Sequence, residues 1–139
     1  MRYWVDTCIW RDFYEDRISD NGIDLSSYAS DVFTKIILKK DKIIYSEALI
    51  WELRKRYTNN EINELLGLLL QNGILIRIPI IEDDKSKART LSKQRGIPFS
   101  DCLIAVQAKR NNAIVISQDK HWIYNLSDTV RAIRPNEIN

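Results

Sequence analysis

The sequence predicts an α/β fold built on a mainly parallel five-stranded sheet that is covered on both faces. Short runs rich in Ile and Val alternate with helical patterns along the whole chain, as expected for stacked βα units. Near-continuous hydrophobicity in the segments AIVIS and ILIRI suits strands that are buried on both faces. With 139 residues, 45% of them hydrophobic, we expect one domain spanning residues 1–139 with a well-filled core.

Five short apolar runs are predicted to form the strands. They are rich in branched residues and are bounded by polar or turn residues, as is typical of strands. The runs are Arg2–Val5, Lys42–Tyr45, Gly73–Ile78, Ala113–Ser117 and Val130–Ile133. Segments with helical signals lie between them.

The first helix is expected after the first strand, where Trp10, Phe13 and Tyr14 have helical spacing. We interpret these aromatic residues as core packing, with a partly exposed groove for a partner as the alternative. Ser26 or Ser27 is then predicted to cap a helix over SYASDVFTKIILKK, because a side-chain hydroxyl can accept a hydrogen bond from a free N–H of the first turn.

Two further helices are predicted from their capping signals. Ser46 is placed to cap EALIWELRKRY. Thr58 and Glu61 form the T-x-x-E capping box before INELLGLLLQ, and Asn72-Gly73 supplies the stop.

The last two predicted helices precede the fourth strand. One runs from about Asp83 to Arg95 and ends at Gly96, with a proline following. Ser100 is predicted to cap the next helix, which runs over residues 101–110.

Composition and charge narrow the functional classes. A net charge of +2 excludes a polycation that coats DNA, so any nucleic-acid contact must be local. Cys8 and Cys102 are too few for a disulfide scaffold, and with the single His121 they lack the spacing of a zinc site. No run is long enough for a membrane span and the N-terminus lacks a signal-peptide pattern, so we expect a soluble, cytoplasmic protein with no membrane partner.

Four acidic residues lie where separate chain segments begin or end. They are Asp6, Glu52, Asp101 and Asp119. Asp6 and Asp119 each follow a predicted strand, and sites in open parallel sheets form beyond the carboxyl ends of the strands. Converging carboxylates repel one another unless a cation or a proton compensates, and hard cations such as Mg²⁺ or Mn²⁺ prefer oxygen ligands. The pattern therefore predicts a metal site suited to attack on a phosphodiester.

Each of these acids also has an ordinary structural explanation. An Asp at a helix start is commonly a cap, an Asp after a strand commonly makes a turn, and a Glu in a helix is commonly solvated. Glu52 is less ordinary because apolar residues surround it in the sequence. The competing candidate is Glu47, whose position next to Ser46 favours a role at the helix terminus.

Four segments together resemble the PIN domain family, which includes the VapC toxins of toxin–antitoxin systems. WVDTCIW resembles the family's D-T-N strand end, and Ser46 followed by Glu52-Leu53 resembles its S-x5-E-L helix. RGIPFSDCLIAVQA resembles its D-x-x-I-A-x-x-A helix, and IVISQDKHW resembles its strand ending in T-x-D before an aromatic residue. The motifs occur in the family's order and span nearly the whole chain.

The resemblance implies a three-layer α/β/α sandwich with sheet order 3-2-1-4-5 and a Mg²⁺- or Mn²⁺-dependent endoribonuclease that hydrolyses RNA. That order makes the first and fourth strands neighbours. It also implies a VapC-like toxin with an antitoxin protein as partner, which in relatives lies beside the first helices and can place a basic side chain in the acidic pocket. A homodimer is the usual assembly among relatives.

The family also assigns roles to individual residues. Asp6 and Asp101 become the central metal ligands, Asp119 completes the cluster partly through water, and Glu52 binds metal or positions the attacking water. The resemblance further implies that Ser117, and similarly Thr7, orient a neighbouring carboxylate by hydrogen bonding.

Two positions depart from the family pattern. Cys8 stands where many relatives have Asn, and a thiol cannot replace the hydrogen bonds of an amide. His121 stands two residues after Asp119, where relatives often carry another acid. We interpret His121 as a surface residue, with contact to a phosphate or leaving group as the functional alternative.

Basic residues provide candidates for RNA binding. Lys85, Arg89 and Lys93 recur every four residues and so share one helix face, although most such runs are simply solvated. Arg56 is favoured because i+4 spacing would place it on the same helix face as Glu52.

Two other functions remain open. One is a stand-alone RNA-processing or quality-control PIN nuclease without an antitoxin. The other is a catalytically weak PIN scaffold that binds RNA or a partner without cutting, which the Cys8 substitution favours.

Overall fold

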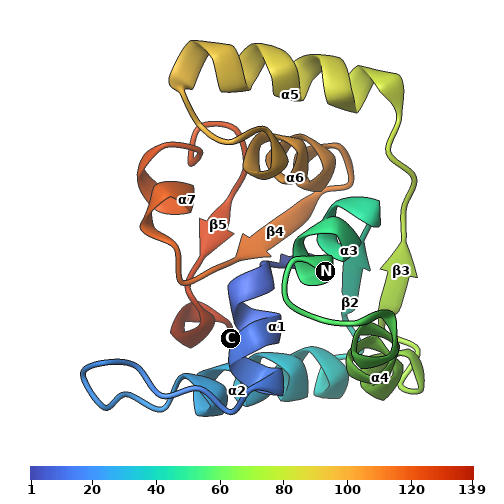
Figure 1. The fold of residues 1–139 in the computed structure, drawn as a ribbon, viewed down its shortest axis with the longest axis vertical. Helices are drawn as coiled ribbons and strands as arrows, with labels where there is room; N and C mark the ends of the chain where they lie inside the picture. The colour runs from blue at the N-terminus through green and yellow to red at the C-terminus, as the bar shows by residue number, and fades with distance from the viewer.

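The computed structural model describes the backbone of residues 1–139 and every side chain except that of Ile123. A five-stranded, all-parallel sheet in the order β3-β2-β1-β4-β5 forms its centre (Figure 1). The strands are β1 (Arg2–Val5), β2 (Lys42–Tyr45), β3 (Leu75–Arg77), β4 (Ala113–Ile116) and β5 (Ala132–Ile133). This order confirms the predicted fold class.

The pairing of β1 with β4 is the feature that positions the candidate site. The two strands run in parallel register from Arg2 opposite Ala113 to Val5 opposite Ile116. Their carboxyl ends are therefore adjacent, and the chain leaves β1 at Asp6 directly beside the end of β4.

Helices cover both faces of the sheet. They are α1 (Thr7–Tyr14), α2 (Leu25–Leu38), α3 (Glu47–Arg54), α4 (Asn59–Leu70), α5 (Glu82–Arg95), α6 (Phe99–Arg110) and α7 (Lys120–Tyr124), and a 3₁₀ turn spans Pro135–Glu137. In Figure 1, α1, α2 and α4 lie on one side of the strands and α5 and α6 on the other. This is the three-layer arrangement that right-handed crossovers in this strand order produce.

Two of the predicted helix starts are confirmed. The Ser46 hydroxyl accepts a hydrogen bond from the Ala48 N–H, which caps α3. Thr58 and Glu61 form a reciprocal capping box at the start of α4.

Two other predicted caps were wrong. Helix α2 begins earlier than Ser26, because the Asp24 carboxylate accepts a hydrogen bond from the Ser27 N–H and caps the helix. Helix α6 begins at Phe99 after Pro98, without a side-chain cap, so Ser100 lies inside its first turn.

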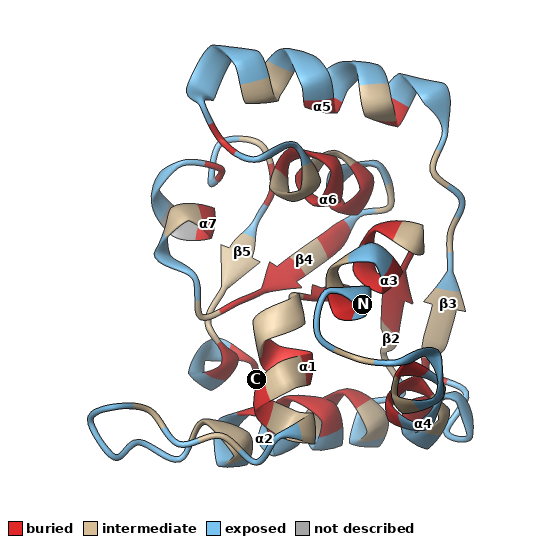
Figure 2. Cartoon of the chain, in the orientation of Figure 1, coloured by how far each residue is buried: buried red, intermediate tan, exposed pale blue. Residues whose placement is uncertain are grey.

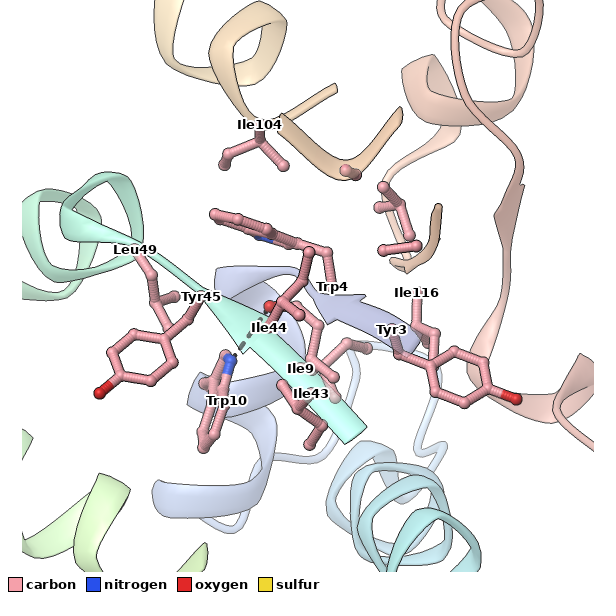
Figure 3. Packing of buried hydrophobic residues seen from close by; sticks show 14 of the residues in the cluster. Tyr3, Trp4, Ile9, Trp10, Ile43, Ile44, Tyr45, Leu49, Ile104 and Ile116 are labelled. Atoms are coloured by element: carbon pink, nitrogen blue, oxygen red, sulfur yellow. Dashed lines mark hydrogen bonds between the residues drawn. The ribbon is translucent and has the colours of Figure 1, made fainter. Parts of the chain in front are cut away.

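The core confirms the packing prediction for the first helix. Trp10 is fully buried against Phe33, and Phe13 packs edge-on against the same ring. The Trp10 indole N–H donates to the Val5 carbonyl at 3.0 Å, which ties α1 to the end of β1. Figure 3 shows Trp4 on the side of the sheet that faces Ile104 of α6 and Trp10 on the other side.

Helix α5 is the least buried of the long helices. Only Asp84 and Ala88 are buried in it, so most of its surface faces solvent (Figure 2). The Asp84 carboxylate accepts two hydrogen bonds of 2.9 Å from the Arg110 guanidinium and one from the Ile81 N–H. This polar contact fastens α5 to α6.

No helix in the described part of the chain is long and apolar enough to cross a membrane.

Candidate metal centre

Asp6 and Asp119 lie at the adjacent ends of β1 and β4, and each begins a helix. The Asp6 carboxylate accepts a hydrogen bond of 2.9 Å from the Thr7 N–H at the start of α1. The Asp119 carboxylate accepts one of 3.2 Å from the His121 N–H at the start of α7. Both acids therefore also serve as the caps that a purely structural explanation expects.

Ser117 joins these two acids. Its hydroxyl donates to Asp6 Oδ2 at 2.6 Å and accepts from the Asp119 N–H at 2.9 Å. Because Ser117 is buried, this link holds the Asp6 carboxylate in one orientation. The contact is of the kind expected for Ser117 from the family resemblance.

His121 joins Asp119 to Asp101, which lies in the first turn of α6. Its ring nitrogens lie 2.9 Å from Asp101 Oδ2 and 2.9 Å from Asp119 Oδ1. The imidazole is therefore a half-buried bridge between two carboxylates, not the surface residue expected from the sequence. Its only sequence signal was its position two residues after Asp119.

Desolvation and repulsion by a neighbouring acid raise the pKa values of Asp6 and Asp101. Burial is the main cause that raises the pKa of Asp6, with Asp119 adding to it, while the hydrogen bond from Ser117 opposes the rise. Burial likewise raises the pKa of Asp101, followed by the charge of Asp6, while His121 opposes it. Each acid thus feels another acid of the cluster, although each comes from a different segment.

Glu52 lies apart from these contacts. It is half-buried on α3, and its carboxylate pairs with Lys55 at 3.1 Å. No hydrogen bond or ion pair links it to Asp6, Asp101 or Asp119 within the described residues. Its grouping with the other acids stays a prediction that depends on a ligand drawing them together.

Glu47 and Arg56 are accounted for by other contacts. Glu47 forms ion pairs with Arg54 and Arg77, consistent with a role at the start of α3. Arg56 pairs with Glu15. The i+4 argument for Arg56 was wrong, because α3 ends at Arg54 and the residue lies outside the helix.

Cys8 and Thr7 complete the surroundings of Asp6. The Cys8 thiol lies 3.6 Å from Asp6 Oδ2 and 3.7 Å from the Ser117 hydroxyl. Burial, followed by the charge of Asp6, raises the pKa of Cys8 to about 12. The Thr7 hydroxyl is buried without a hydrogen-bond partner, an unusual state that a ligand or water at the site would relieve.

The donor atoms suit a hard divalent cation in kind, because the acids of the cluster offer carboxylate oxygens. Among the described residues, however, no three Asp, Glu, His or Cys side chains lie close enough together to hold an ion as they stand. His121 occupies the space between two of the carboxylates. Ion binding would therefore require these side chains to reorient.

Comparison with protein families and solved structures gives a consistent result. The family model described as PIN domain matches residues 3–127. Comparison with curated proteins finds no match. VapBC2 from Rickettsia felis bound to a promoter DNA fragment is similar, with a TM-score of 0.69 and 19% identity over 96% of this chain and 98% of that one.

Two further structures have the same fold. A toxin–antitoxin complex from Klebsiella pneumoniae matches with a TM-score of 0.64 and 15% identity over 98% of this chain and 99% of that one. FitAcB from Neisseria gonorrhoeae matches with a TM-score of 0.61 and 21% identity over 99% of this chain and 100% of that one. At these identities the similarity is evidence of shared fold.

Proposed function

The chain belongs to the PIN domain family, and from this premise we propose that it is a Mg²⁺- or Mn²⁺-dependent endoribonuclease. The observation that carries the proposal is the chain of contacts from Asp6 through Ser117 to Asp119 and through His121 to Asp101. It gathers acids from three segments at the carboxyl edge of the sheet. Capping explains why Asp6 and Asp119 begin helices, but it does not require a third acid, Asp101, to be linked to them, since repulsion and partial desolvation raise the free energy of the fold.

The proposed roles follow from the contacts of each side chain. Asp6, Asp101 and Asp119 would hold the ion, and Ser117 would keep Asp6 oriented toward it. A bound divalent ion would neutralise charge that develops on the phosphate oxygens and lower the pKa of a water molecule. Glu52, whose ion pair among the described residues is with exposed Lys55, would bind the ion or orient the attacking water.

Cleavage of a mixed RNA with and without Mg²⁺ or Mn²⁺ tests the proposal. Asp6→Ala, Asp101→Asn and Asp119→Asn should each lose most activity, since the loss of one ligand displaces the ion from the reacting oxygens. Glu52→Gln should also be severe. Glu47→Gln is the matched control and should be much milder, because the Glu47 carboxylate is engaged by Arg54 and Arg77.

The ends of the products provide a second criterion. Attack by water without participation of the ribose 2′-hydroxyl should leave 5′-phosphate and 3′-hydroxyl ends. Cleavage that continues in EDTA and leaves a 2′,3′-cyclic phosphate would contradict both the residue roles and the mechanism.

We further propose that the enzyme is a VapC-like toxin that an antitoxin holds inactive, and that it forms a homodimer. Support comes from the similar solved structures, which include toxin–antitoxin complexes. Ile18 and Ile23, between α1 and α2, are also exposed apolar residues beside the first helices. Co-purification with the product of a neighbouring small reading frame would favour this function over a stand-alone RNA-processing nuclease.

A non-cutting scaffold that binds RNA or a partner is the second candidate. The observation that favours it is the His121 ring, which contacts the two carboxylates an ion would need. RNA binding without cleavage at any Mg²⁺ or Mn²⁺ concentration would support the scaffold.

A further inference from the structure

Helix α3 carries Glu52, yet the contacts of Glu52 do not fix its place in the fold. Its carboxylate pairs with Lys55, three residues further along the chain, and the Lys55 side chain is 68% exposed. Solvent-exposed ion pairs of this kind restrain a side chain only weakly. The position of Glu52 relative to Asp6 and Asp101 therefore depends on how α3 itself is held. Helix α3 contacts both α1 and α6 (Figure 1).

The start of α3 is hydrogen-bonded to helix α6. The Ser46 hydroxyl, which caps α3, donates to Gln107 Oε1 at 2.8 Å, and both side chains are fully buried. The Gln107 amide donates in turn to the Pro79 carbonyl at 3.4 Å, and the Arg110 guanidinium donates to the same carbonyl at 3.2 Å. Gln107 therefore joins the start of α3 to α6 and to the segment between β3 and α5.

The end of α3 is connected to helix α1 through Glu15, the residue directly after α1. The Glu15 carboxylate accepts a hydrogen bond from the Tyr57 hydroxyl, in the segment between α3 and α4, and one of 3.0 Å from Arg11. It also pairs with Arg56 at 3.6 Å, and the Tyr14 ring packs edge-on against Tyr57. Burial, followed by the hydrogen bond to Glu15, raises the pKa of Tyr57, so the phenol keeps its proton and remains a donor.

These two anchors are directional, unlike the apolar packing of α3. Leu49 and Leu53 bury one face of α3 in the core, but hydrophobic contacts have no preferred direction and alone would allow the helix to slide or rotate. A hydrogen bond requires a narrow range of distances and angles, and a buried polar group that loses its partner is costly. Directional contacts at opposite ends of one helix fix both its register and its axis.

We propose that Gln107 and Tyr57 are positioning residues that hold α3, and with it Glu52, in a fixed place between α6 and α1. Asp101 lies on α6, six residues before Gln107, and Asp6 caps α1. The two helices to which α3 is anchored are therefore the helices associated with the other acids. Each anchor sets the place of Glu52 relative to one of them.

The distance from anchor to acid magnifies small movements of α3. Glu52 lies six residues after Ser46, which corresponds to about 9 Å along the helix. A rotation of α3 by about 6° at its first residue therefore displaces Glu52 by about 1 Å, and a misplacement of that size can cost roughly 100-fold in rate. The inference rests on the proposed ribonuclease function, in which Glu52 binds the ion or orients the attacking water.

Cleavage of a mixed-sequence RNA in Mn²⁺ measures kcat and KM for variants of the two anchors. Gln107→Met removes both hydrogen bonds of the amide, and Tyr57→Phe removes a single hydroxyl. Each should lower kcat by roughly 10- to 100-fold with KM nearly unchanged, because substrate binding does not need the exact place of Glu52. Combined with Glu52→Gln, neither substitution should lower kcat further, because each acts through Glu52.

Arg110→Ala is the matched control for a variant that only destabilises the fold. Arg110 lies three residues after Gln107 on α6, and its substitution removes the ion pair with Asp84 but leaves the hydrogen bond between Ser46 and Gln107 in place. It should lower the melting temperature and retain the native kcat at a temperature where the variant is folded. Thermal unfolding of every variant identifies that temperature.

The place of α3 can also be measured without catalysis. Nitroxide labels on Arg54→Cys of α3 and Phe99→Cys of α6 each lie two residues from an acid of the proposed centre. Electron paramagnetic resonance in EDTA then gives the distribution of distances between the two helices. Gln107→Met should broaden or shift this distribution, whereas Arg110→Ala should leave it as in the labelled native chain. The unsubstituted chain, treated with the same label, measures the background from its own cysteines.

The outcomes distinguish failure of this inference from failure of the proposed function. If the native chain cleaves nothing, the ribonuclease function fails, and the label distances decide whether Gln107 holds α3. If the native chain cleaves RNA, an unchanged kcat in either anchor variant overturns the role of that residue. A loss that adds in full to the loss caused by Glu52→Gln overturns it as well. An unchanged distance distribution in Gln107→Met overturns the first anchor in either case.

Discussion

His121 is the residue whose environment most affects the candidate site. Its ring contacts Asp101 and Asp119 at 2.9 Å each, so it offsets part of their repulsion in the metal-free chain. An incoming cation would compete for the same oxygen atoms. In the proposed metal centre, the histidine would therefore set the balance between the stability of the metal-free fold and access of the ion.

His121→Ala should accordingly lower the melting temperature of the metal-free protein and enlarge the rise in melting temperature produced by millimolar Mn²⁺. The reason is that stabilisation by a ligand increases with its affinity for the folded state, as the logarithm of concentration over Kd, and the competing imidazole has been removed. Differential scanning fluorimetry measures both quantities. A smaller Mn²⁺ effect in the variant would instead make His121 a ligand of the ion.

Cys8 should be chemically inert in the folded protein. Its pKa is raised to about 12 by burial and by the adjacent Asp6 carboxylate, whereas the thiolate is the reactive form. We expect iodoacetamide at pH 8 to leave Cys8 unmodified in the native chain and to label it after denaturation in urea. Peptide mass spectrometry reports the site. Rapid labelling of native Cys8 would contradict this description of its surroundings.

At the scale of elements, α5 depends on one polar anchor. Asp84 is buried and accepts both hydrogen bonds of the Arg110 fork, and little else of α5 is buried. Of the rest of α5, the apolar side chains that pack on the core are Ala88 and the partly buried Leu91, so hydrophobic packing compensates for little of a lost polar contact. The position of α5 on α6 consequently depends in part on an ion pair.

Arg110→Ala should therefore destabilise the protein by about 3 kcal/mol, because it leaves a buried carboxylate without its partner. Lys87→Ala is the control, since its pair with Asp83 is exposed and should contribute almost nothing. Urea unfolding gives both values. Equal effects of the two substitutions would show that the Asp84–Arg110 pair does not anchor α5.

The sequence predicted those elements whose signals are local. Ser46 and the capping box of Thr58 and Glu61 lie at the starts of the helices that they cap, so short-range hydrogen bonding was enough to predict where both helices begin. Helix α7 was not predicted, because five residues are too few for a periodic pattern. Arg56 was wrongly predicted to lie on α3. The helix ends at Arg54, because the chain must leave it to reach the cap of α4 at Thr58, and the spacing of apolar residues does not indicate where a helix ends.

For the candidate site, the sequence predicted which acids lie at segment ends but not the contacts among them. The proximity of Asp6 and Asp119 follows from the pairing of β1 with β4, which the family resemblance supplied. The bridge from His121 to Asp101 joins residues on two helices, and its geometry depends on how α6 and α7 pack. Such contacts join residues that are far apart in the sequence, so the spacing of residues within one segment cannot predict them.

At the scale of the whole molecule, the acidic cluster should give the metal-free protein an unusual pH dependence. The raised pKa values of Asp6 and Asp101 mean that the folded state binds protons more readily than the unfolded state just above pH 4. Lowering the pH from neutrality should therefore stabilise the fold at first. Glu15 and Asp128 have lowered pKa values, Asp128 to about 2, so stability should fall again at lower pH.

We expect the metal-free protein to be more stable at mildly acidic pH than at pH 8, as a balance of these opposing groups. Urea unfolding between pH 3 and 8 in EDTA measures the curve. Asp101→Asn should reduce the gain in stability as the pH falls below neutrality, because one of the three carboxyl groups with a raised pKa, Asp6, Asp12 and Asp101, is gone. Stability that increases steadily up to pH 8 would mean that the cluster is not strained by its charges.

The distribution of tryptophan has an optical consequence. Trp4, Trp10 and Trp122 are almost completely buried, whereas Trp51 on α3 is 43% exposed. The three enclosed indoles emit from an apolar interior, and the fourth alone meets water. The long-wavelength edge of the protein's intrinsic fluorescence therefore reports on Trp51, so binding of any molecule that covers this part of α3 can be followed without a label.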